Sequence, residues 1–172
     1  MDKFKAYLSA NKITSSASEA FSLNSISSMG DKIENKIHYT LVEALYLMKK
    51  GKFELFKEKK KISEESLMNL AEKKEHNFFA RFRAYSDLKS RGYTVKTALK
   101  FGADFRVYDK GKKPGEEHAK WIVFAVYETD KLTWYEFAAK NRVAHSTKKN
   151  LLLAIVDSEG DITYYEVRWL KP

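Results

Sequence analysis

The stretch that decides the fold is "ADFRVYDKGKKPGEEHAKWIVFAV", from Ala103 to Val126. Its opening alternates apolar and polar side chains, which is the period of a strand with one buried face. A loop rich in Lys, Gly and Glu follows, and the apolar run behind it predicts a second strand. Tyr108 ends the first strand, and His118 stands just ahead of the second. If the two strands pair, the loop brings both side chains to the same end of one sheet.

A third strand end carries another candidate side chain, Lys149. It stands directly before "NLLLAIVD", and such a continuous apolar run is typical of a central strand buried on both faces. The sequence also predicts strands at "TVKTAL" and "ITYYEVRWL", and a helix after Thr133, which forms a capping box with Glu136. We therefore expect the second half to form a mixed sheet flanked by helices, an α/β layer domain.

The first half predicts a smaller domain that also mixes helices and strands, so the fold class is α/β (α+β). Thr40 and Glu43 form a capping box at the start of one helix, which Gly51 ends. Ser63 is the expected N-cap of a second helix, and "KFELFKE" between the two helices alternates like a strand.

The domain boundary is expected near residues 76–80, where the second helix breaks and a third begins. The chain is thus predicted to divide into a mixed α/β domain at residues 1–78 and a C-terminal domain at residues 79–172, which carries the candidate catalytic residues Tyr108, His118 and Lys149. Two stretches of the first domain have weaker patterns. The Ser-rich residues 14–28 are interpreted as turns and short strands, and the lysines at 59–61 as a solvated turn.

Positive charge is distributed unevenly over the chain, whose 172 residues carry a formal net charge of +9. Residues 1–80 hold 14 lysines, no arginine and 11 acidic residues, whereas residues 81–172 hold 12 lysines, 6 arginines and 12 acidic residues. Arginine binds phosphate through a planar fork of donors and stacks on bases. This asymmetry indicates a polyanionic partner for the second half, the alternative being a basic surface that serves solubility.

Other classes of site have no support in the sequence. Cysteine is missing, which excludes thiolate chemistry and fits a reducing interior such as the cytoplasm. The four histidines lack zinc spacing, so we expect neither a metal site nor a cofactor. A metal-dependent nuclease is disfavoured, because Asp104 is available but "EEHAK" spaces its Glu and Lys wrongly. No apolar run is long enough to cross a membrane.

Tyr108, His118 and Lys149 suit one reaction, the cleavage of RNA by its own 2′-hydroxyl. A base removes the 2′-OH proton, the oxygen attacks the adjacent phosphorus, and an acid protonates the departing 5′-oxygen. Histidine titrates near neutrality and suits the acid, whereas lysine is a compact cation suited to the charged intermediate. Taken singly, each residue is more simply a packing or solvated side chain, so the inference rests on their combination.

Three segments closely resemble the archaeal tRNA-splicing endonuclease family. They are "GYTVKTALKFGADFRVYDKG", "HAKWIVFAV" and "RVAHSTKKNLLLAIVDSEGDITYYEV". The resemblance covers residues 88–172, and "LVEALYLMKKGK" is similar to the first domain of that family. It implies a metal-independent endoribonuclease that cuts introns from precursor tRNA at a bulge–helix–bulge. The products would carry a 2′,3′-cyclic phosphate and a 5′-hydroxyl.

The resemblance also implies a role for each candidate residue. Tyr108 would be the general base, His118 the general acid, and Lys149 (with Lys148 as the alternative) the cation that stabilises the transition state. His145 is a rival acid. The family clamps a flipped bulge base between side chains contributed across subunits, and Arg142 fits one of these. The second member stays open among three residues of the last strand, namely Tyr164, Arg168 and Trp169.

The fold implied for the second domain is a restriction-endonuclease-like sheet. Subunits of this length resemble those that form tetramers, in which an acidic loop of one subunit docks in a basic pocket of another. The turn "DSEGD" would supply that loop through Asp157, Glu159 and Asp161, although an ordinary polar β-turn has the same composition. A homotetramer is expected, with a mixed tetramer of two subunit types as the alternative. The alternative function is that of a non-catalytic, RNA-binding structural subunit of a mixed tetramer, a hypothesis that the intact set of three residues disfavours.

Overall fold

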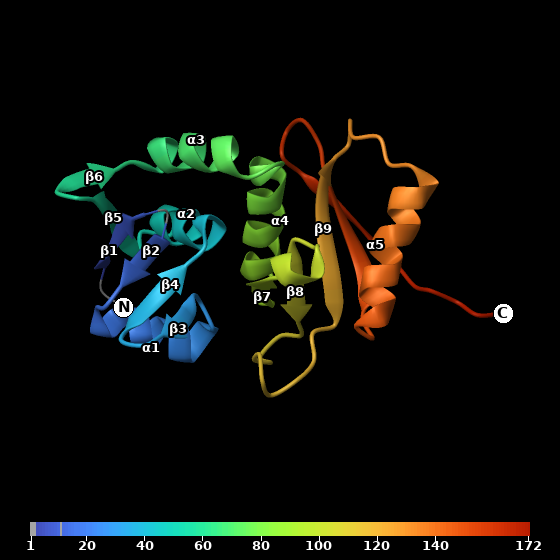
Figure 1. Ribbon diagram of the computed structural model, residues 1–172, viewed down its shortest axis with the longest axis horizontal. Helices are drawn as coiled ribbons and strands as arrows, with labels where there is room; N and C mark the ends of the chain where they lie inside the picture. The colour runs from blue at the N-terminus through green and yellow to red at the C-terminus, as the bar shows by residue number, and fades with distance from the viewer. Residues whose placement is uncertain (1–2, 11) are drawn as a thin grey trace. The chain divides into compact units, whose positions relative to one another are not determined.

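The computed structural model describes residues 3–10 and 12–172. The chain divides into two compact units, Met1–Phe78 and Phe79–Pro172, and each is described by itself. Each unit contains a mixed sheet with helices (Figure 1). The α/β class predicted from the sequence is therefore confirmed.

A six-stranded sheet organises the described part of the first unit, in the order β3-β4-β2-β1-β5-β6. Its strands are β1 (Phe4–Ser9), β2 (Lys12–Ser15), β3 (Asp31–Ile33), β4 (Lys36–Tyr39), β5 (Phe53–Lys57) and β6 (Lys60–Ile62). Its helices are α1 (Ser18–Ser27), α2 (Leu41–Lys49) and α3 (Glu64–Lys74). The sheet is mixed because β1 runs parallel to β5 and antiparallel to β2.

Local signals set the ends of two helices in this unit, as predicted. Glu43 N–H donates to the Thr40 hydroxyl at 3.3 Å, and the Glu43 carboxylate accepts from Thr40 N–H at 3.0 Å, which completes the capping box of α2. Gly51 takes a φ of +63° just after the helix, a backbone conformation that favours glycine. Ser63 caps α3 through the N–H of Ser66.

Two expectations for this unit were wrong. Residues 14–28 contain helix α1, not only turns and strands. Serine is a weak helix former because its hydroxyl competes for backbone groups. Here the hydroxyls of Ser22 and Ser27 bond to the carbonyls four residues earlier, which is compatible with the helix. Lys60 and Lys61 form part of strand β6, because the turn at Glu58 closes a hairpin with β5.

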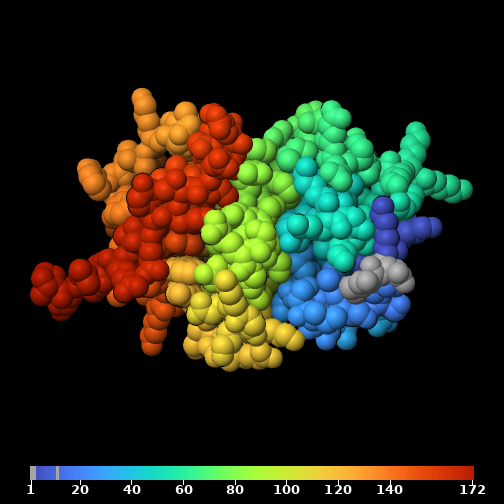
Figure 2. Space-filling model, turned by 180° about the vertical axis from the view of Figure 1, so that it is seen from behind, coloured from blue at the N-terminus to red at the C-terminus, as the bar shows by residue number. Residues whose placement is uncertain are grey.

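The second unit contains a five-stranded sheet in the order β11-β10-β9-β8-β7. Its strands are β7 (Thr94–Thr97), β8 (Phe105–Tyr108), β9 (Trp121–Tyr127), β10 (Asn150–Val156) and β11 (Ile162–Val167). Helix α4 (Phe78–Ser90) and helix α5 (Trp134–Ser146) lie on opposite faces of this sheet (Figure 1), and a 3₁₀ turn, η1 (Leu99–Phe101), precedes β8. The chain beyond β11 projects from the body of this unit (Figure 2).

Both faces of the sheet are packed against helices. On one face, Tyr85 of α4 lies 5.6 Å from Phe105 of β8, measured between ring centroids. On the other face, Ile122 and Leu151 form a buried cluster with Ala144 of α5. The residues of β10 are mostly buried, in agreement with the continuous apolar run that predicted a central strand.

Strand direction determines which residues meet at the edge of this sheet. Strands β9 and β10 are parallel, so they begin at the same edge, and β8 is antiparallel to β9, so it ends there. Tyr108, His118 and Lys149 stand respectively at the end of β8, before β9 and before β10. The topology therefore brings three segments far apart in sequence to one edge, here called the convergent edge. Within the described residues, no helix is long and apolar enough to cross a bilayer.

Candidate active site

A cavity of about 300 Å³ lies at the convergent edge. Tyr108, His118 and Lys149 all line it. The other lining residues are Phe101, Arg106, Gly115, Glu116, Glu117 and Ala119. The three candidates that the sequence placed on separate strand ends thus line the same cavity in the second unit.

Tyr108 reaches the cavity from the last position of β8. It pairs in register with Thr94 of β7, which fixes its backbone, and its side chain is buried. Arg106 precedes it by two residues and therefore faces the same side of the sheet. This side is the one covered by α5, because Arg106 is paired with Ile122, a member of the cluster around Ala144.

His118 lies on the loop between β8 and β9 and is exposed. The ladder between these strands extends to Lys120, whose N–H donates to the Val107 carbonyl at 2.8 Å. Within the loop, Lys112 N–H donates to the Asp109 carbonyl at 3.0 Å, which turns the chain back. The imidazole is therefore close to a fixed strand end yet open to solvent, as an acid that exchanges protons requires.

Lys149 is positioned by the way helix α5 ends. Lys149 N–H donates to the Ala144 carbonyl at 2.9 Å and Lys148 N–H to the His145 carbonyl at 2.9 Å, the two bonds of a Schellman motif. Lys148 takes a φ of +56° at the turn, is exposed and does not line the cavity. The two adjacent lysines therefore differ, and Lys149 is the one at the cavity.

The ammonium group of Lys149 lies in an unusual environment. Its Nζ donates to the Thr147 carbonyl at 2.6 Å. Burial lowers the pKa of this lysine, and the nearby positive charge of Arg106 lowers it further. Lys149 and Arg106 thus bring two cations to one small cavity. Arg106 is not among the site residues predicted from the sequence, although the alternation of β8 already placed it on the same face as Tyr108.

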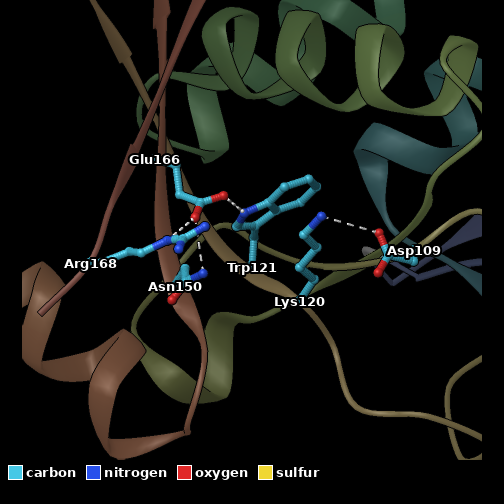
Figure 3. Close-up of polar contacts among 6 residues, drawn as sticks. All are labelled: Asp109, Lys120, Trp121, Asn150, Glu166 and Arg168. Carbon is cyan, nitrogen blue, oxygen red and sulfur yellow. Dashed lines mark hydrogen bonds and ion pairs between the residues drawn. The ribbon is translucent and has the colours of Figure 1, made fainter.

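Figure 3 shows a belt of polar contacts among six residues at or next to the strand ends of the convergent edge. Its members, which come from β9, β10, β11 and the segments next to β8, β9 and β11, are Asp109, Lys120, Trp121, Asn150, Glu166 and Arg168. Asp109 directly follows Tyr108, and Asn150 directly follows Lys149. The belt therefore joins the strand ends that carry the candidate residues.

Glu166 is the centre of this belt. Its carboxylate accepts hydrogen bonds from Trp121 Nε1 at 2.8 Å, Asn150 Nδ2 at 3.1 Å and Arg168 Nε at 2.6 Å. The bond from Trp121 and the charge-assisted bond from Arg168 hold the pKa of Glu166 below its usual value. The Trp121 ring in turn lies 4.3 Å from Lys120 Nζ, measured to the ring centroid. These contacts tie the first residues of β9 and β10 to β11.

The three candidates for the second clamp residue lie in different places. Tyr164 is half-buried, and its hydroxyl donates to Asp87 of α4 at 2.8 Å. Burial and the nearby Asp87 raise its pKa. Arg168 and Trp169 follow the end of β11 and are exposed, whereas the sequence pattern predicts them inside that strand.

Arg142 and His145 both belong to α5. Arg142 is exposed, and its guanidinium carbon lies 6.0 Å from the ring centroid of Tyr135. The His145 ring lies 4.4 Å from the Trp169 ring, measured between centroids. His145 is not among the residues that line the cavity. Trp169 is therefore the clamp candidate beside α5, the helix that carries Arg142.

The acidic turn between β10 and β11 lies at the opposite end of β10. The Asp157 carboxylate accepts from Glu159 N–H at 2.9 Å and from Asp161 N–H at 2.8 Å, so it closes the turn. Glu159 and Asp161 are exposed. Arg83 of α4 donates from Nε to the Gly160 carbonyl at 2.7 Å. Asp157 is thus used within the turn, while two carboxylates remain at the surface.

Asp104, the acid that a metal-dependent nuclease would have used, is committed elsewhere. Its Oδ1 lies 2.8 Å from Arg81 Nε, and its Oδ2 accepts from Ala125 N–H at 2.8 Å. Burial raises its pKa, against the lowering effect of these two partners. Among the described residues, no three His, Asp or Glu side chains gather so that they could hold a metal ion.

Fold and site together define a class of protein. A basic α/β protein with a phenol, an imidazole and two cations around one small cavity has the groups for acid–base chemistry on a phosphodiester. Residues 78–164 match the family described as tRNA intron endonuclease, catalytic C-terminal domain, and residues 4–68 match its N-terminal domain.

Curated relatives agree with these matches. The chain is 42% identical to a tRNA-splicing endonuclease of Thermococcus kodakarensis over 166 residues, which cover 96% of this chain and 97% of the relative. It is 47% identical to a tRNA-splicing endonuclease of Nanoarchaeum equitans over 138 residues, which cover 77% of this chain and 88% of the relative. The chain belongs to the tRNA intron endonuclease family and is an endonuclease, as the sequence motifs had indicated.

Proposed function

We propose that this protein cuts precursor tRNA at bulge–helix–bulge intron boundaries through attack of the RNA 2′-hydroxyl, without a metal ion. The products would be a 2′,3′-cyclic phosphate and a 5′-hydroxyl. Family membership supports the substrate class. The observation that carries the mechanism is the shared cavity of Tyr108, His118 and Lys149. The absence of cysteine fits action in the reducing cytoplasm.

Each of the three side chains has one step in this proposal. The Tyr108 oxygen takes the proton of the 2′-hydroxyl, which then attacks the neighbouring phosphorus. His118 gives a proton to the departing 5′-oxygen, and its exposed position lets solvent restore that proton. Lys149 stabilises the charge that develops on the non-bridging oxygens. A 300 Å³ cavity has room for one phosphodiester linkage, with the rest of the RNA outside it.

The RNA is proposed to be held by a base clamp as well. Arg142 is one member, because it is exposed on α5 and free of any carboxylate contact among those described for it. For the second member, Arg168 and Trp169 remain, since both are exposed at the end of β11. Tyr164 is disfavoured because its hydroxyl already contacts Asp87 of α4 and its ring contacts Arg91, which directly follows that helix. Guanidinium groups and aromatic rings both stack on bases.

Assembly into a tetramer is proposed from the acidic turn. The exposed carboxylates of Glu159 and Asp161 would dock in a basic pocket of another subunit, and Asp157 would hold the turn in shape. A homotetramer is the form we propose, and a mixed tetramer with a second subunit type is the alternative. Either form would offer two sites to a substrate that has two bulges.

The experiment that tests this function mixes the purified single chain with an intron-containing precursor tRNA in excess EDTA and measures cleavage. The mass of the protein assembly is measured in solution in parallel. We expect cleavage at both intron boundaries by a homotetramer, with cyclic phosphate on the 5′ fragment. Cleavage that requires a divalent ion would contradict the mechanism. Tight binding without cleavage would instead indicate a non-catalytic structural subunit, and adding candidate partner subunits would then distinguish a mixed tetramer from an inert chain.

A further inference from the structure

Arg106 is the residue of the cavity to which the proposed function gives no step. It lines the cavity together with Tyr108, His118 and Lys149. It lies two residues before Tyr108 on β8, so the two side chains project from the same face of the strand. Its position is rigid, because β8 is hydrogen-bonded to strands on both sides and Arg106 is paired in register with Lys96 and Ile122.

The guanidinium group of Arg106 is held on an aromatic surface. Its central carbon lies 5.6 Å from the ring centroid of Phe101, which also lines the cavity. Such stacking restricts the plane of the guanidinium while leaving its edge available for hydrogen bonds. A planar fork with a fixed orientation is the geometry that recognises two oxygens of one phosphate.

Packing alone does not account for this arginine. Its Nε is buried and, within residues 3–10 and 12–172, makes no hydrogen bond. A buried donor without a partner destabilises a fold, and such groups are rare in native proteins. If the arginine only stabilised the fold, its donors should find acceptors within the protein. If it binds a ligand, the missing acceptor is expected to come from that ligand.

The charges around the cavity leave room for an anion. Arg106 and Lys149 are close enough that the positive charge of Arg106 helps to lower the pKa of Lys149. Two carboxylates, Glu116 and Glu117, also line the cavity, and Glu117 is paired with Lys112 at 2.5 Å. A phosphodiester carries one negative charge, and the five-coordinate phosphorane formed by 2′-oxygen attack carries a second. One lysine neutralises a single charge, whereas Lys149 and Arg106 together match two.

We propose that Arg106 is a further catalytic residue, which binds the non-bridging oxygens of the scissile phosphate together with Lys149. This inference rests on the proposed function. In it, the guanidinium edge donates to a phosphate oxygen in the ground state. The contact strengthens as the 2′-oxygen–phosphorus bond forms, the bond to the 5′-oxygen breaks and charge develops. The buried Nε donor of Arg106 then destabilises the free enzyme, and it gains a hydrogen-bond partner when the substrate binds.

Arg106→Gln and Arg106→Lys are the variants that test it, compared in single-turnover cleavage of a precursor tRNA. We expect Arg106→Gln to lower the rate about 10²-fold or more, the loss typical of one transition-state donor. The cleavage rate of Arg106→Lys should lie between those of the wild type and Arg106→Gln, because lysine keeps the charge but not the planar fork. Arg91→Gln is the matched control, since Arg91 is an exposed arginine that pairs with Asp87 away from the cavity. It should cleave at the wild-type rate.

A stereospecific phosphorothioate at the cleavage site separates contact from mere structural support. Replacing the oxygen that Arg106 contacts by sulfur should slow the wild-type enzyme. The same replacement should slow Arg106→Gln much less, because the contact is already missing. The proposal would be overturned if Arg106→Gln cleaved more slowly but kept the full sulfur effect with both diastereomers. It would also be overturned if Arg106→Gln cleaved at the wild-type rate. If Arg106→Gln fails to fold, the sulfur effect in Arg106→Lys decides. A wild-type enzyme that does not cut would refute the proposed function itself, before Arg106 is considered.

Discussion

The two ends of strand β10 carry opposite charges. Where it begins, Lys149 and Arg106 bring two cations to the cavity. Where it ends, the turn to β11 carries Asp157, Glu159 and Asp161. Each end has a residue with left-handed backbone conformation nearby. Lys148 precedes the start of the strand, and Gly160 lies in the turn that follows its end. The same strand thus separates a cavity with two cations from an acidic turn.

The difference between these ends lies in how their polar groups are satisfied. At the acidic turn, Asp157 accepts two backbone N–H groups and Arg83 donates to the Gly160 carbonyl, so the turn is complete in itself. At the cavity, the buried Nε of Arg106 makes no hydrogen bond within the described part of the chain. A self-satisfied turn indicates a rigid structural feature, whereas an unsatisfied donor beside other reactive groups indicates a place for a ligand.

The largest expected effect is at His118. Removing the acid in His118→Ala should lower the cleavage rate about 10²- to 10⁴-fold, while binding of precursor tRNA persists. His145→Ala is the matched control, because the His145 ring contacts Trp169 and does not line the cavity. The cleavage rate of this control should fall less than tenfold. Equal losses in the two variants, measured in single-turnover assays, would contradict the assignment.

The two adjacent lysines provide the second test. Lys149→Met should reduce the rate about 10²- to 10³-fold, because one cation leaves the transition state. Lys148→Met should cleave nearly as the wild type does, since Lys148 is exposed outside the cavity. The Lys149 pKa is lowered, so its charge is lost at a lower pH than that of an ordinary lysine. If Lys148 proves to be the sensitive residue, the Schellman geometry does not describe the active enzyme.

The third test contrasts the two left-handed residues. Gly160 has a φ of +85°, and a Cβ added there would come within 3.0 Å of Arg83 Nε. Gly160→Ala should therefore lower the free energy of unfolding by about 1–3 kcal/mol. Lys148→Gly should be neutral or stabilise by up to about 1 kcal/mol, since glycine suits a φ of +56°. Denaturant titrations measure both, and destabilisation by Lys148→Gly would show that its side chain has a structural role.

The smallest effect is expected at the exposed acids of the turn. The double variant Glu159→Gln with Asp161→Asn should weaken assembly by up to about 30-fold, since exposed ion pairs contribute about 0–1 kcal/mol each. Light scattering across a dilution series would detect the shift in mass. Glu72→Gln on α3 is the control, because Glu72 is also exposed. An unchanged assembly in the double variant would indicate that subunits associate through other surfaces.

Much of the second unit was predictable, because its signals are local and strong. The alternation of "DFRVYD" and the continuous run "NLLLAIVD" predicted strands of the right kind, and the Thr133–Glu136 box set the start of α5. The positions of Tyr108, His118 and Lys149 at strand ends followed from the same patterns. Their meeting in one cavity depends on strand direction and pairing, which the sequence patterns do not determine and the structure specifies.

Other features were beyond the reach of sequence patterns. Helix α1 has Ala20 as its buried residue and almost no apolar face, so periodicity gave no signal for it. Strand β6 consists largely of exposed lysines, and it forms because β5 offers a pairing edge. The belt around Glu166 joins residues of three strands and of the segments next to them, and such contacts require the register of the whole sheet. The open donor of Arg106 is likewise visible only once its surroundings are known.

The central claim is that side chains from three strand ends act on one phosphodiester. The most direct test is a crystal structure with a precursor RNA that carries a 2′-deoxy nucleotide at the cleavage site, so that cutting is blocked. We expect the scissile phosphate in the cavity, its oxygens within hydrogen-bond distance of Lys149 and Arg106. His118 should face the 5′-oxygen, and Tyr108 the 2′ position. A scissile phosphate bound elsewhere on the protein, away from these four side chains, would contradict the account.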